Sequence, residues 1–202
     1  MTARVIRIDA TRPDSGTLDA AAAVLRQGGL VAFPTETFYG LGAAALNRAG
    51  VERAFALKGR PRSSPLLVLV DSVAMVERIA IVSDTARSLM ARHWPGALTL
   101  VLPARAVMPI EVTASTGTVG VRLSPHAVAR GLVSALREPV TAPSANLTGE
   151  LPPTRPAEVL RYFGEAIDLV LDAGETPGGI PSTVLDVSVE PPRLIRSGAV
   201  KL

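Results

Sequence analysis

The sequence predicts a single α/β domain, spanning residues 1–202, with a mixed sheet. Three observations favour this class. Short apolar segments typical of strands are mixed irregularly with segments in which apolar residues recur at helical spacing. Of all residues, 48% are hydrophobic but only 3% are aromatic, so aliphatic side chains must fill the core. No internal repeat, low-complexity tract or linker divides the chain.

Short apolar segments predict the strands. Residues 5–8 alternate between polar and apolar side chains, and residues 30–33 stop at Pro34. Residues 66–70 form a continuous apolar run between Pro65 and Asp71, which is typical of a buried strand. Further strands are expected at residues 98–102, 118–123, 139–142, 168–171, 183–187 and 194–196.

Helices are predicted where apolar residues recur at helical spacing or follow a capping residue. Residues 17–27 are rich in alanine, and Gly28-Gly29 ends this segment. Asn47 is expected to cap the next helix, which carries Lys58 on the same side as its apolar residues. The dipeptide Ser124-Pro125 has the form of an N-cap followed by proline, and predicts a helix to about residue 136. Other helices are expected at residues 72–79, 84–92 (capped by Ser83) and 156–163.

The composition excludes several kinds of chemistry. The chain has no cysteine, which rules out disulfides, thiolate metal sites and thiol nucleophiles. Its two histidines, His93 and His126, are too few for an expected zinc site, so no metal-binding residue is assigned. The signatures GxxxxGK[ST], HExxH and GxSxG are missing, as is a GxGxxG that opens a helix. The chain therefore offers few of the residues that a catalytic triad needs.

Charge and targeting patterns suggest a cytoplasmic protein without membrane contact. The first residues lack the basic start and long apolar run of a signal peptide, and no apolar stretch reaches the length of a membrane span. The net charge is +3 and the isoelectric point is about 9.9, which is mildly basic. Of the 21 basic residues only Lys58 and Lys201 are lysines. A general arginine bias explains most of the arginines, but a lysine in mid-sequence suggests a specific role.

Two polar motifs in the first half of the chain are candidates for a site. In PTETFYGLG (residues 34–42) three polar side chains follow a strand, and glycines permit close approach of the backbone to a ligand. An ordinary strand-to-helix turn, with threonine and glutamate as caps, is the alternative. In KGRPR (residues 58–62) three cations at the end of a helix resemble a phosphate clamp, although cations also suit a helix C-terminus.

The second half of the chain adds further candidates. In PSAN (residues 143–146) a hydroxyl and an amide two positions apart can bind a polar ligand, or can simply form a turn. Ser182-Thr183 and Arg196-Ser-Gly198 give weaker signals. Arg122 gives a stronger one, because a charge on a strand of valine and leucine must face a partner or a wet cavity.

Taken together and in this order, the motifs resemble those of the YrdC/TsaC family of threonylcarbamoyl-AMP synthases. The resemblance covers residues 5–198 and implies a YrdC-like domain with a twisted mixed sheet, flanked by helices around a basic cavity. Because the chain ends at Leu202, it looks like the short form without an extra C-terminal domain. The motifs are PTETFYGLG, KGRP followed by PLLV, WPGALT, VGVRL, APSAN, STVLDV and LIRSG.

The resemblance implies an enzyme, a nucleotidyltransferase. It would form threonylcarbamoyl-AMP and pyrophosphate from L-threonine, bicarbonate or CO₂, and ATP, for N6-threonylcarbamoyladenosine modification of tRNA. Mg²⁺ is expected to accompany the ATP, with no protein-held transition metal. The partner tRNA would be reached directly or through a separate threonylcarbamoyl transferase complex.

The resemblance also implies roles for single residues. Lys58 and Arg60 would be catalytic and would grip the ATP phosphates. The other nucleotide contacts would be Thr118, Ser144, Asn146 and Arg196. The threonine pocket would consist of Thr35, Arg122, the backbone of Ala142, and Ser182. Ser64 and Leu69 depart from the family pattern, where asparagine and histidine are common, so a local rearrangement of the threonine pocket is expected and Leu69 receives no role.

Three alternatives remain open. The basic cavity could bind double-stranded RNA or tRNA, which strongly salt-dependent affinity would indicate; the scarcity of aromatic residues argues against base stacking. The chain could be a paralogue that uses another acyl acceptor, like the related domain of hydrogenase maturation carbamoyltransferases. It could also be a fold relative of unsettled activity.

Overall fold

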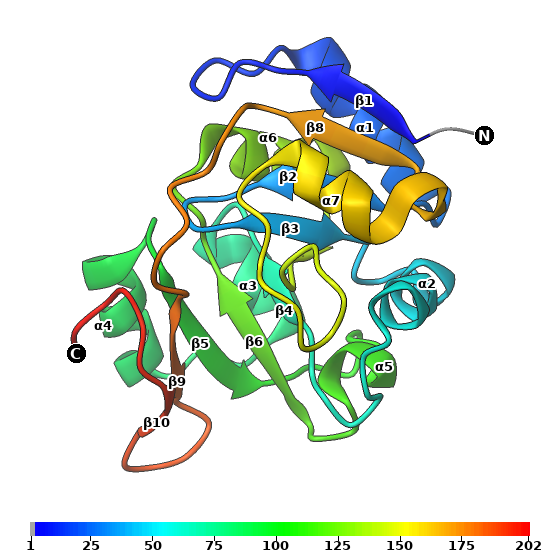
Figure 1. The fold of residues 1–202 in the computed structure, drawn as a ribbon. Coiled ribbons are helices and arrows are strands. Elements are labelled where there is room, and N and C mark those ends of the chain that lie inside the picture. The colour runs from blue at the N-terminus through cyan, green and yellow to red at the C-terminus, as the bar shows by residue number, and fades with distance from the viewer. Residues whose placement is uncertain (1–2) are drawn as a thin grey trace.

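The computed structural model describes residues 3–202, and its strands form two mixed sheets (Figure 1). The four-stranded sheet has the order β1 (Arg4–Arg7), β8 (Leu169–Asp172), β2 (Val31–Pro34), β3 (Tyr39–Gly42). The six-stranded sheet has the order β10 (Arg193–Arg196), β9 (Thr183–Asp186), β5 (Leu98–Pro103), β6 (Thr118–Arg122), β4 (Leu67–Leu69), β7 (Val140–Thr141). Each sheet contains parallel and antiparallel pairs, which confirms the predicted mixed class.

The two sheets meet along a hydrogen-bonded seam between β3 and the chain around β7. The Leu41 amide donates to the Pro143 carbonyl and the Ala145 amide donates to the Tyr39 carbonyl, each at 2.8 Å. The single twisted sheet implied by the resemblance is thus divided in two, with backbone hydrogen bonds continuing across the boundary. This seam brings the PTETFYGLG segment beside the PSAN segment.

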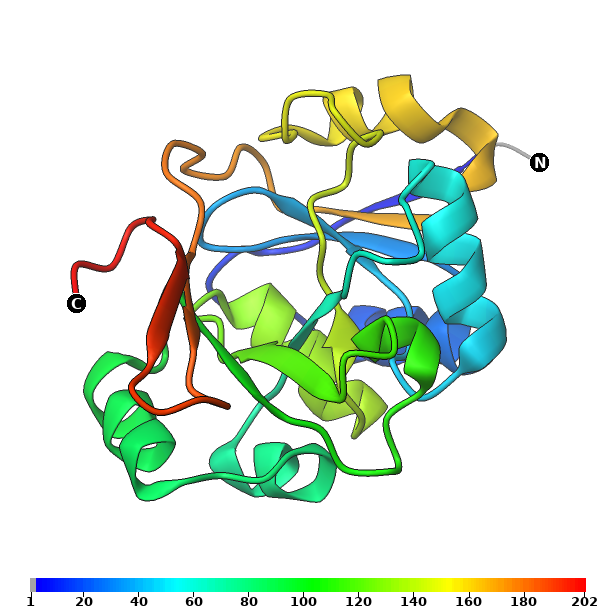
Figure 2. The ribbon, with the colours of Figure 1, turned by 90° about the horizontal axis from the view of Figure 1, so that it is seen from below.

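Helices cover the four-stranded sheet on both faces, with α7 on one and α1 and α6 on the other (Figures 1 and 2). Strand β2 is buried throughout because its side chains alternate between these layers: Val31 and Phe33 join the larger core cluster, whereas Ala32 joins the cluster under α7. The helices are α1 (Ser15–Arg26), α2 (Arg48–Lys58), α3 (Val73–Ile79), α4 (Asp84–His93), α5 (Ile110–Thr113), α6 (Ala127–Leu136) and α7 (Pro156–Phe163), followed by the 3₁₀ turn η1 (Gly164–Ala166).

Helix α2 ends where the sequence predicts a functional lysine. The Asn47 side chain caps its first turn by accepting a 3.1 Å hydrogen bond from the Gly50 amide, as expected. Gly59 ends the helix in the left-handed conformation, at φ +58°, which glycine adopts without the cost a side chain would bring. Lys58 is therefore the last helical residue, and it is buried with the apolar side of the helix.

The predicted start of α6 is wrong. The helix begins at Ala127 and not at Pro125, and its N-cap is His126, whose Nδ1 accepts a 3.3 Å hydrogen bond from the Val128 amide. The Ser124 oxygen accepts a 3.1 Å hydrogen bond from the His126 amide, two residues farther along, and its hydroxyl donates to the carboxylate of Glu36.

Helix α5 and strand β3 were not expected from the sequence. None of the helices within residues 3–202 is long and apolar enough to cross a membrane.

Candidate functional site

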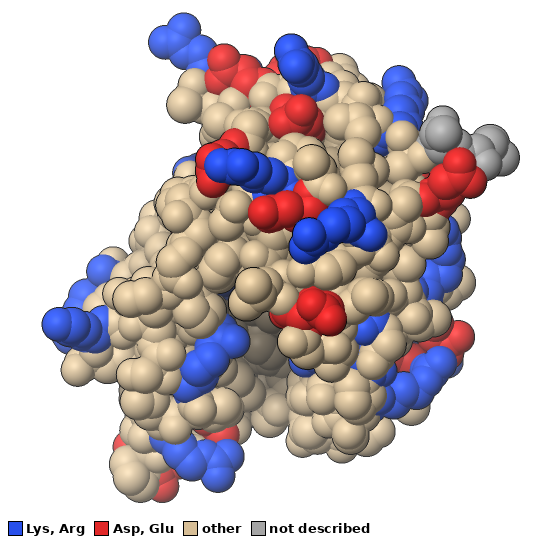
Figure 3. Space-filling model, viewed as in Figure 1, with Lys and Arg blue, Asp and Glu red and all other residues tan. Residues whose placement is uncertain are grey.

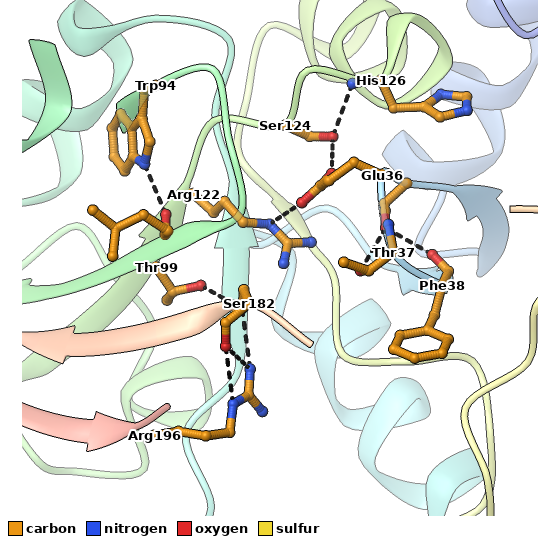
Figure 4. Close-up of polar contacts among 12 residues, drawn as sticks. Glu36, Thr37, Phe38, Trp94, Thr99, Arg122, Ser124, His126, Ser182 and Arg196 are labelled. Atoms are coloured by element: carbon orange, nitrogen blue, oxygen red, sulfur yellow. Dashed lines mark hydrogen bonds and ion pairs between the residues drawn. The ribbon is translucent and has the colours of Figure 1, made fainter. Parts of the chain in front are cut away.

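Several of the predicted site residues converge in front of β6. Figure 4 shows Arg122, from the end of this strand, pointing toward the turn that carries Glu36 and Thr37, with Ser182 and Arg196 nearby. The same side of the molecule is hollowed between β9–β10 and the chain that precedes α7, and basic side chains lie along the walls of the hollow (Figure 3). A separate depression of about 710 Å³, lined in part by Arg7 and Asp172, lies beside β1 and contains none of the predicted site residues.

Arg122 is a deeply buried cation of the site, with 4% of its surface exposed. Its Nε lies 3.3 Å from Glu36 Oε1, so the charge on this strand faces a partner, one of the two surroundings expected from the sequence. Within the described residues neither of these two atoms has an aligned hydrogen bond. Burial lowers the pKa of Arg122, Glu36 partly opposes this shift, and the charge of Arg196 adds to it.

Glu36 is in turn fixed by the segment after β6. Its Oε2 accepts a short hydrogen bond from the Ser124 hydroxyl, and Ser124 Oγ accepts a 3.1 Å hydrogen bond from the His126 amide. Burial lowers the pKa of His126, while Glu36 opposes this. Neither Glu36 nor Ser124 was expected among the site residues, although Glu36 stands within the PTET motif.

The PTET segment forms the tight connection between β2 and β3, not a strand-to-helix turn. Thr35 closes it: its hydroxyl donates to the Phe38 carbonyl at 2.7 Å and accepts a 3.2 Å hydrogen bond from the Thr37 amide. Thr35 is 2% exposed. The turn therefore holds Glu36 and Thr37 beside Arg122 with little freedom.

Ser182 and Arg196 form a second cluster next to Arg122. Arg196 Nη2 donates to Ser182 Oγ at 3.0 Å and to the Ser182 carbonyl at 2.8 Å. The Thr99 hydroxyl lies 3.0 Å from the same Oγ. Burial lowers the pKa of Arg196. Thr99 is a site neighbour that sequence reasoning missed, although it lies within the WPGALT motif.

Lys58 joins the KGRPR and PSAN motifs. Its Nζ donates a short hydrogen bond to the Ser144 carbonyl and a 2.6 Å hydrogen bond to the Asn146 carbonyl. Burial, together with the charge of Arg60, lowers the pKa of Lys58 to about 8. Lys58 is 3% exposed, and both of these hydrogen-bond acceptors are backbone carbonyls rather than carboxylates.

Asn146 and Arg60 shape the surroundings of this lysine. Asn146 Nδ2 donates to the carbonyls of Leu147 and Glu150, each at 2.8 Å, whereas its buried Oδ1 lacks a hydrogen-bond partner among residues 3–202. Arg60 Nη2 donates to the Pro65 carbonyl at 2.8 Å, and burial lowers its pKa. An unpaired buried acceptor is costly, so Asn146 Oδ1 is a position where a ligand donor would be stabilised.

The remaining predicted residues lie farther apart. Ala142 is at the seam, where its amide donates to the Leu67 carbonyl at 2.9 Å. Thr118 stands at the opposite end of β6 from Arg122, roughly 13 Å away at the rise of a strand, with its hydroxyl 2.9 Å from that of Thr116. Leu69, a departure from the family pattern, is the parallel neighbour of Arg122 and is fully buried.

Comparison with known families finds relatives over most of the chain. The Sua5/YciO/YrdC family model, described as "Telomere recombination", matches residues 23–198. The threonylcarbamoyl-AMP synthase of Pyrococcus abyssi is 44% identical over 90% of this chain and 54% of its own length. That of Bacillus subtilis is 42% identical over 89% and 53%. A putative threonylcarbamoyl-AMP synthase of Mycobacterium tuberculosis is 35% identical over 90% and 83%.

Solved structures share the fold. P. abyssi Sua5 complexed with L-threonine matches with a TM-score of 0.92 and 42% identity, over 96% of this chain and 57% of its own. Escherichia coli YciO matches with a TM-score of 0.91 over 98% of this chain and 97% of its own, but at 24% identity it supports the fold alone. The chain spans about half the length of the Pyrococcus and Bacillus synthases. The resemblance seen in the motifs is thereby confirmed, and the chain belongs to the Sua5/YciO/YrdC family.

Proposed function

We propose that the protein is an L-threonylcarbamoyladenylate synthase, a nucleotidyltransferase that makes threonylcarbamoyl-AMP and pyrophosphate from L-threonine, bicarbonate or CO₂, and ATP. The observation that carries the proposal is the presence of two buried pairs of cations: Arg122 with Arg196, and Lys58 with Arg60. One suits a small carboxylate and the other a chain of phosphates. The relatives that bear the name of this activity, and the Sua5 solved with L-threonine, support the same function.

The amino acid would bind at Arg122. The two Nη groups of this arginine make no hydrogen bond to residues of the described chain and are available to a ligand carboxylate. Ser182 supplies a hydroxyl beside them, Thr35 holds the neighbouring turn in shape, and the backbone of Ala142 would complete the pocket. A planar guanidinium binds a carboxylate with two parallel hydrogen bonds, which fixes orientation as well as affinity.

The nucleotide would bind along Lys58 and Arg60. Lys58 would meet a phosphate oxygen with the one N–H that the carbonyls of Ser144 and Asn146 leave free. Asn146 Oδ1, which is buried and unpaired, would accept a hydrogen bond from the nucleotide. The further nucleotide contacts in this proposal are Thr118, the Ser144 side chain and Arg196.

The reaction needs little acid–base chemistry from the protein. The neutral amine of threonine adds to the carbon of CO₂ and forms a carbamate, and the nitrogen passes one proton to water. With bicarbonate the same C–N bond forms while a C–O bond breaks, and the hydroxide leaves with that proton as water. A carbamate oxygen then attacks the α-phosphorus of ATP, the bond to the bridging oxygen breaks, and pyrophosphate leaves. Charge develops on phosphate oxygens, so fixed cations such as Lys58 would stabilise the transition state.

Mg²⁺ would accompany the triphosphate. The nucleotide side of the site offers cations and a single unpaired amide oxygen, and within residues 3–202 no three His, Asp or Glu side chains gather into a metal site. This donor set fits an Mg²⁺ ion that keeps phosphate oxygens and water as its ligands. Bound in that way, the ion would neutralise part of the phosphate charge.

In the cell, the product would serve N6-threonylcarbamoyladenosine modification of tRNA, reached directly or through a threonylcarbamoyl transferase complex. Residues 1–202 would act as one unit in the cytoplasm. The direct test is chemical: incubation with ATP, L-threonine and radiolabelled bicarbonate should yield an AMP adduct that carries the label and the mass of threonylcarbamoyl-AMP. If the protein forms no labelled adduct but binds RNA with an affinity that depends strongly on salt, the proposal is contradicted.

A further inference from the structure

Among residues 3–202, the guanidinium of Arg122 has its ion-pair partner on one edge. Its Nε faces Glu36 Oε1 at 3.3 Å, while the far end of the guanidinium extends into the space beside Thr37 and Ser182 (Figure 4). An arginine can bind a carboxylate through its Nε edge or through its two Nη groups. Because Glu36 occupies the first, the Nη end is the one left for a ligand.

Glu36 is held in place by Ser124, on the side away from Arg122. Its other oxygen, Oε2, accepts the hydroxyl proton of Ser124, and the Ser124 oxygen accepts the His126 amide proton at 3.1 Å. Each donor in this chain meets an acceptor, so a single arrangement of hydrogens satisfies it. The side chains of Arg122 and Glu36 are 5% and 13% exposed, so neither can turn into bulk water.

We propose that Glu36 is a positioning residue which, anchored by Ser124, occupies the Nε edge of Arg122 and orients its two Nη groups toward the carboxylate of the amino-acid substrate. The inference rests on the proposed function, and it adds a residue pair that directs one binding contact. A glutamine at position 36 has the same shape but carries no negative charge to pair with Arg122, and one of its two terminal atoms is a donor.

Isothermal titration separates this role from a general structural one. Glu36→Gln should weaken L-threonine binding about tenfold, because the amide lacks the negative charge that holds the Arg122 guanidinium, and leave ATP affinity within about twofold. Ser124→Ala should weaken L-threonine binding in the same direction. The matched control is Glu111→Gln, since Glu111 is also a mostly buried glutamate, 15% exposed, that pairs with an arginine, Arg48, at 3.2 Å. Both affinities should stay within about twofold there.

The outcomes are distinct. Unchanged or tighter L-threonine binding in Glu36→Gln would overturn the positioning role, as would equal loss of L-threonine and ATP binding in a folded variant. If Glu36→Gln does not fold, Ser124→Ala decides, and normal L-threonine affinity there overturns the role. If the unmodified protein itself binds no L-threonine, the proposed function fails, and the inference fails with it.

Discussion

The side-chain ammonium of Lys58 donates a 2.6 Å hydrogen bond to the backbone carbonyl of Asn146, which lies 88 residues farther along the chain. The Thr148 amide returns a 2.9 Å hydrogen bond to the Lys58 carbonyl. The end of α2 is therefore hydrogen-bonded to the loop after β7 through both the side chain and the backbone of Lys58. An ammonium has three donors, and the two backbone carbonyls leave one in a fixed direction.

Lys58→Ala is expected to lower the rate of pyrophosphate formation on the order of 10²–10³-fold, the usual effect of removing one fixed transition-state donor. Lys58→Arg should not restore the full rate, because a planar fork cannot reproduce a point charge between two carbonyls. Steady-state kinetics at saturating substrates measures both. The control is Arg62→Ala, since Arg62 is an exposed neighbour that pairs with Glu52 on the surface. Full activity of Lys58→Ala would remove this residue from the catalytic account.

The affinity for ATP should fall as the pH rises through about 8. Burial lowers the pKa of Lys58 from 10.5 to about 8, so the amine loses its charge above that pH. Titration calorimetry on either side of pH 8 measures the effect, and Lys58→Arg should abolish it because arginine stays charged. The contribution of Lys58 to the free energy of unfolding should change in the opposite direction. Between about pH 8 and 10.5 the unfolded chain binds more protons than the folded chain, so this contribution rises with pH. A pH-independent ATP affinity would argue against contact between Lys58 and phosphate.

Arg122→Ala should abolish L-threonine binding and also destabilise the fold by about 3–5 kcal/mol, because it leaves Glu36 largely buried without its partner. Thermal and chemical denaturation measure the second effect. The double variant Arg122→Met with Glu36→Gln should recover most of the stability, since it removes both charges, without recovering L-threonine binding. Binding of L-threonine by the double variant would show that Arg122 is not the carboxylate anchor.

Gly42→Ala should destabilise the protein by about 1–3 kcal/mol through overpacking in the seam. A Cβ at this position would lie 2.8 Å from Phe33 Cε1 and 3.0 Å from Val140 Cγ1. The matched control is Gly120→Ala on β6, where the nearest atom, Thr99 Cγ2, would lie at 3.5 Å and make an ordinary contact. Equal stability of the two variants in denaturant would mean that the seam is loosely packed.

Local signals predicted those parts of the fold that depend on neighbouring residues. The Asn47 cap, the helical side shared by Lys58 and its apolar neighbours, and the buried strand after Pro65 were all readable from spacing and residue type. Strand β3 could not be predicted in this way, because two of its four residues are glycines and its extended conformation depends on pairing with β2. The motifs also named Arg122 and Lys58 as residues of interest.

The contacts of those two residues could not be predicted from the sequence. Glu36 accepts a hydrogen bond from Ser124 across 88 residues, and α6 begins at Ala127 with His126 as its cap. Local capping rules compare Ser124 only with its neighbours, so they place the cap there. The contact with Glu36 is tertiary, and such rules do not reveal it.

Pyrophosphate release from ATP, measured with L-threonine and bicarbonate each present or omitted, is the decisive experiment for the proposed synthase reaction. Release should require both L-threonine and bicarbonate, and threonylcarbamoyl-AMP should accumulate. Release that does not depend on L-threonine would instead indicate another acceptor, and no release under any condition would contradict the synthase function.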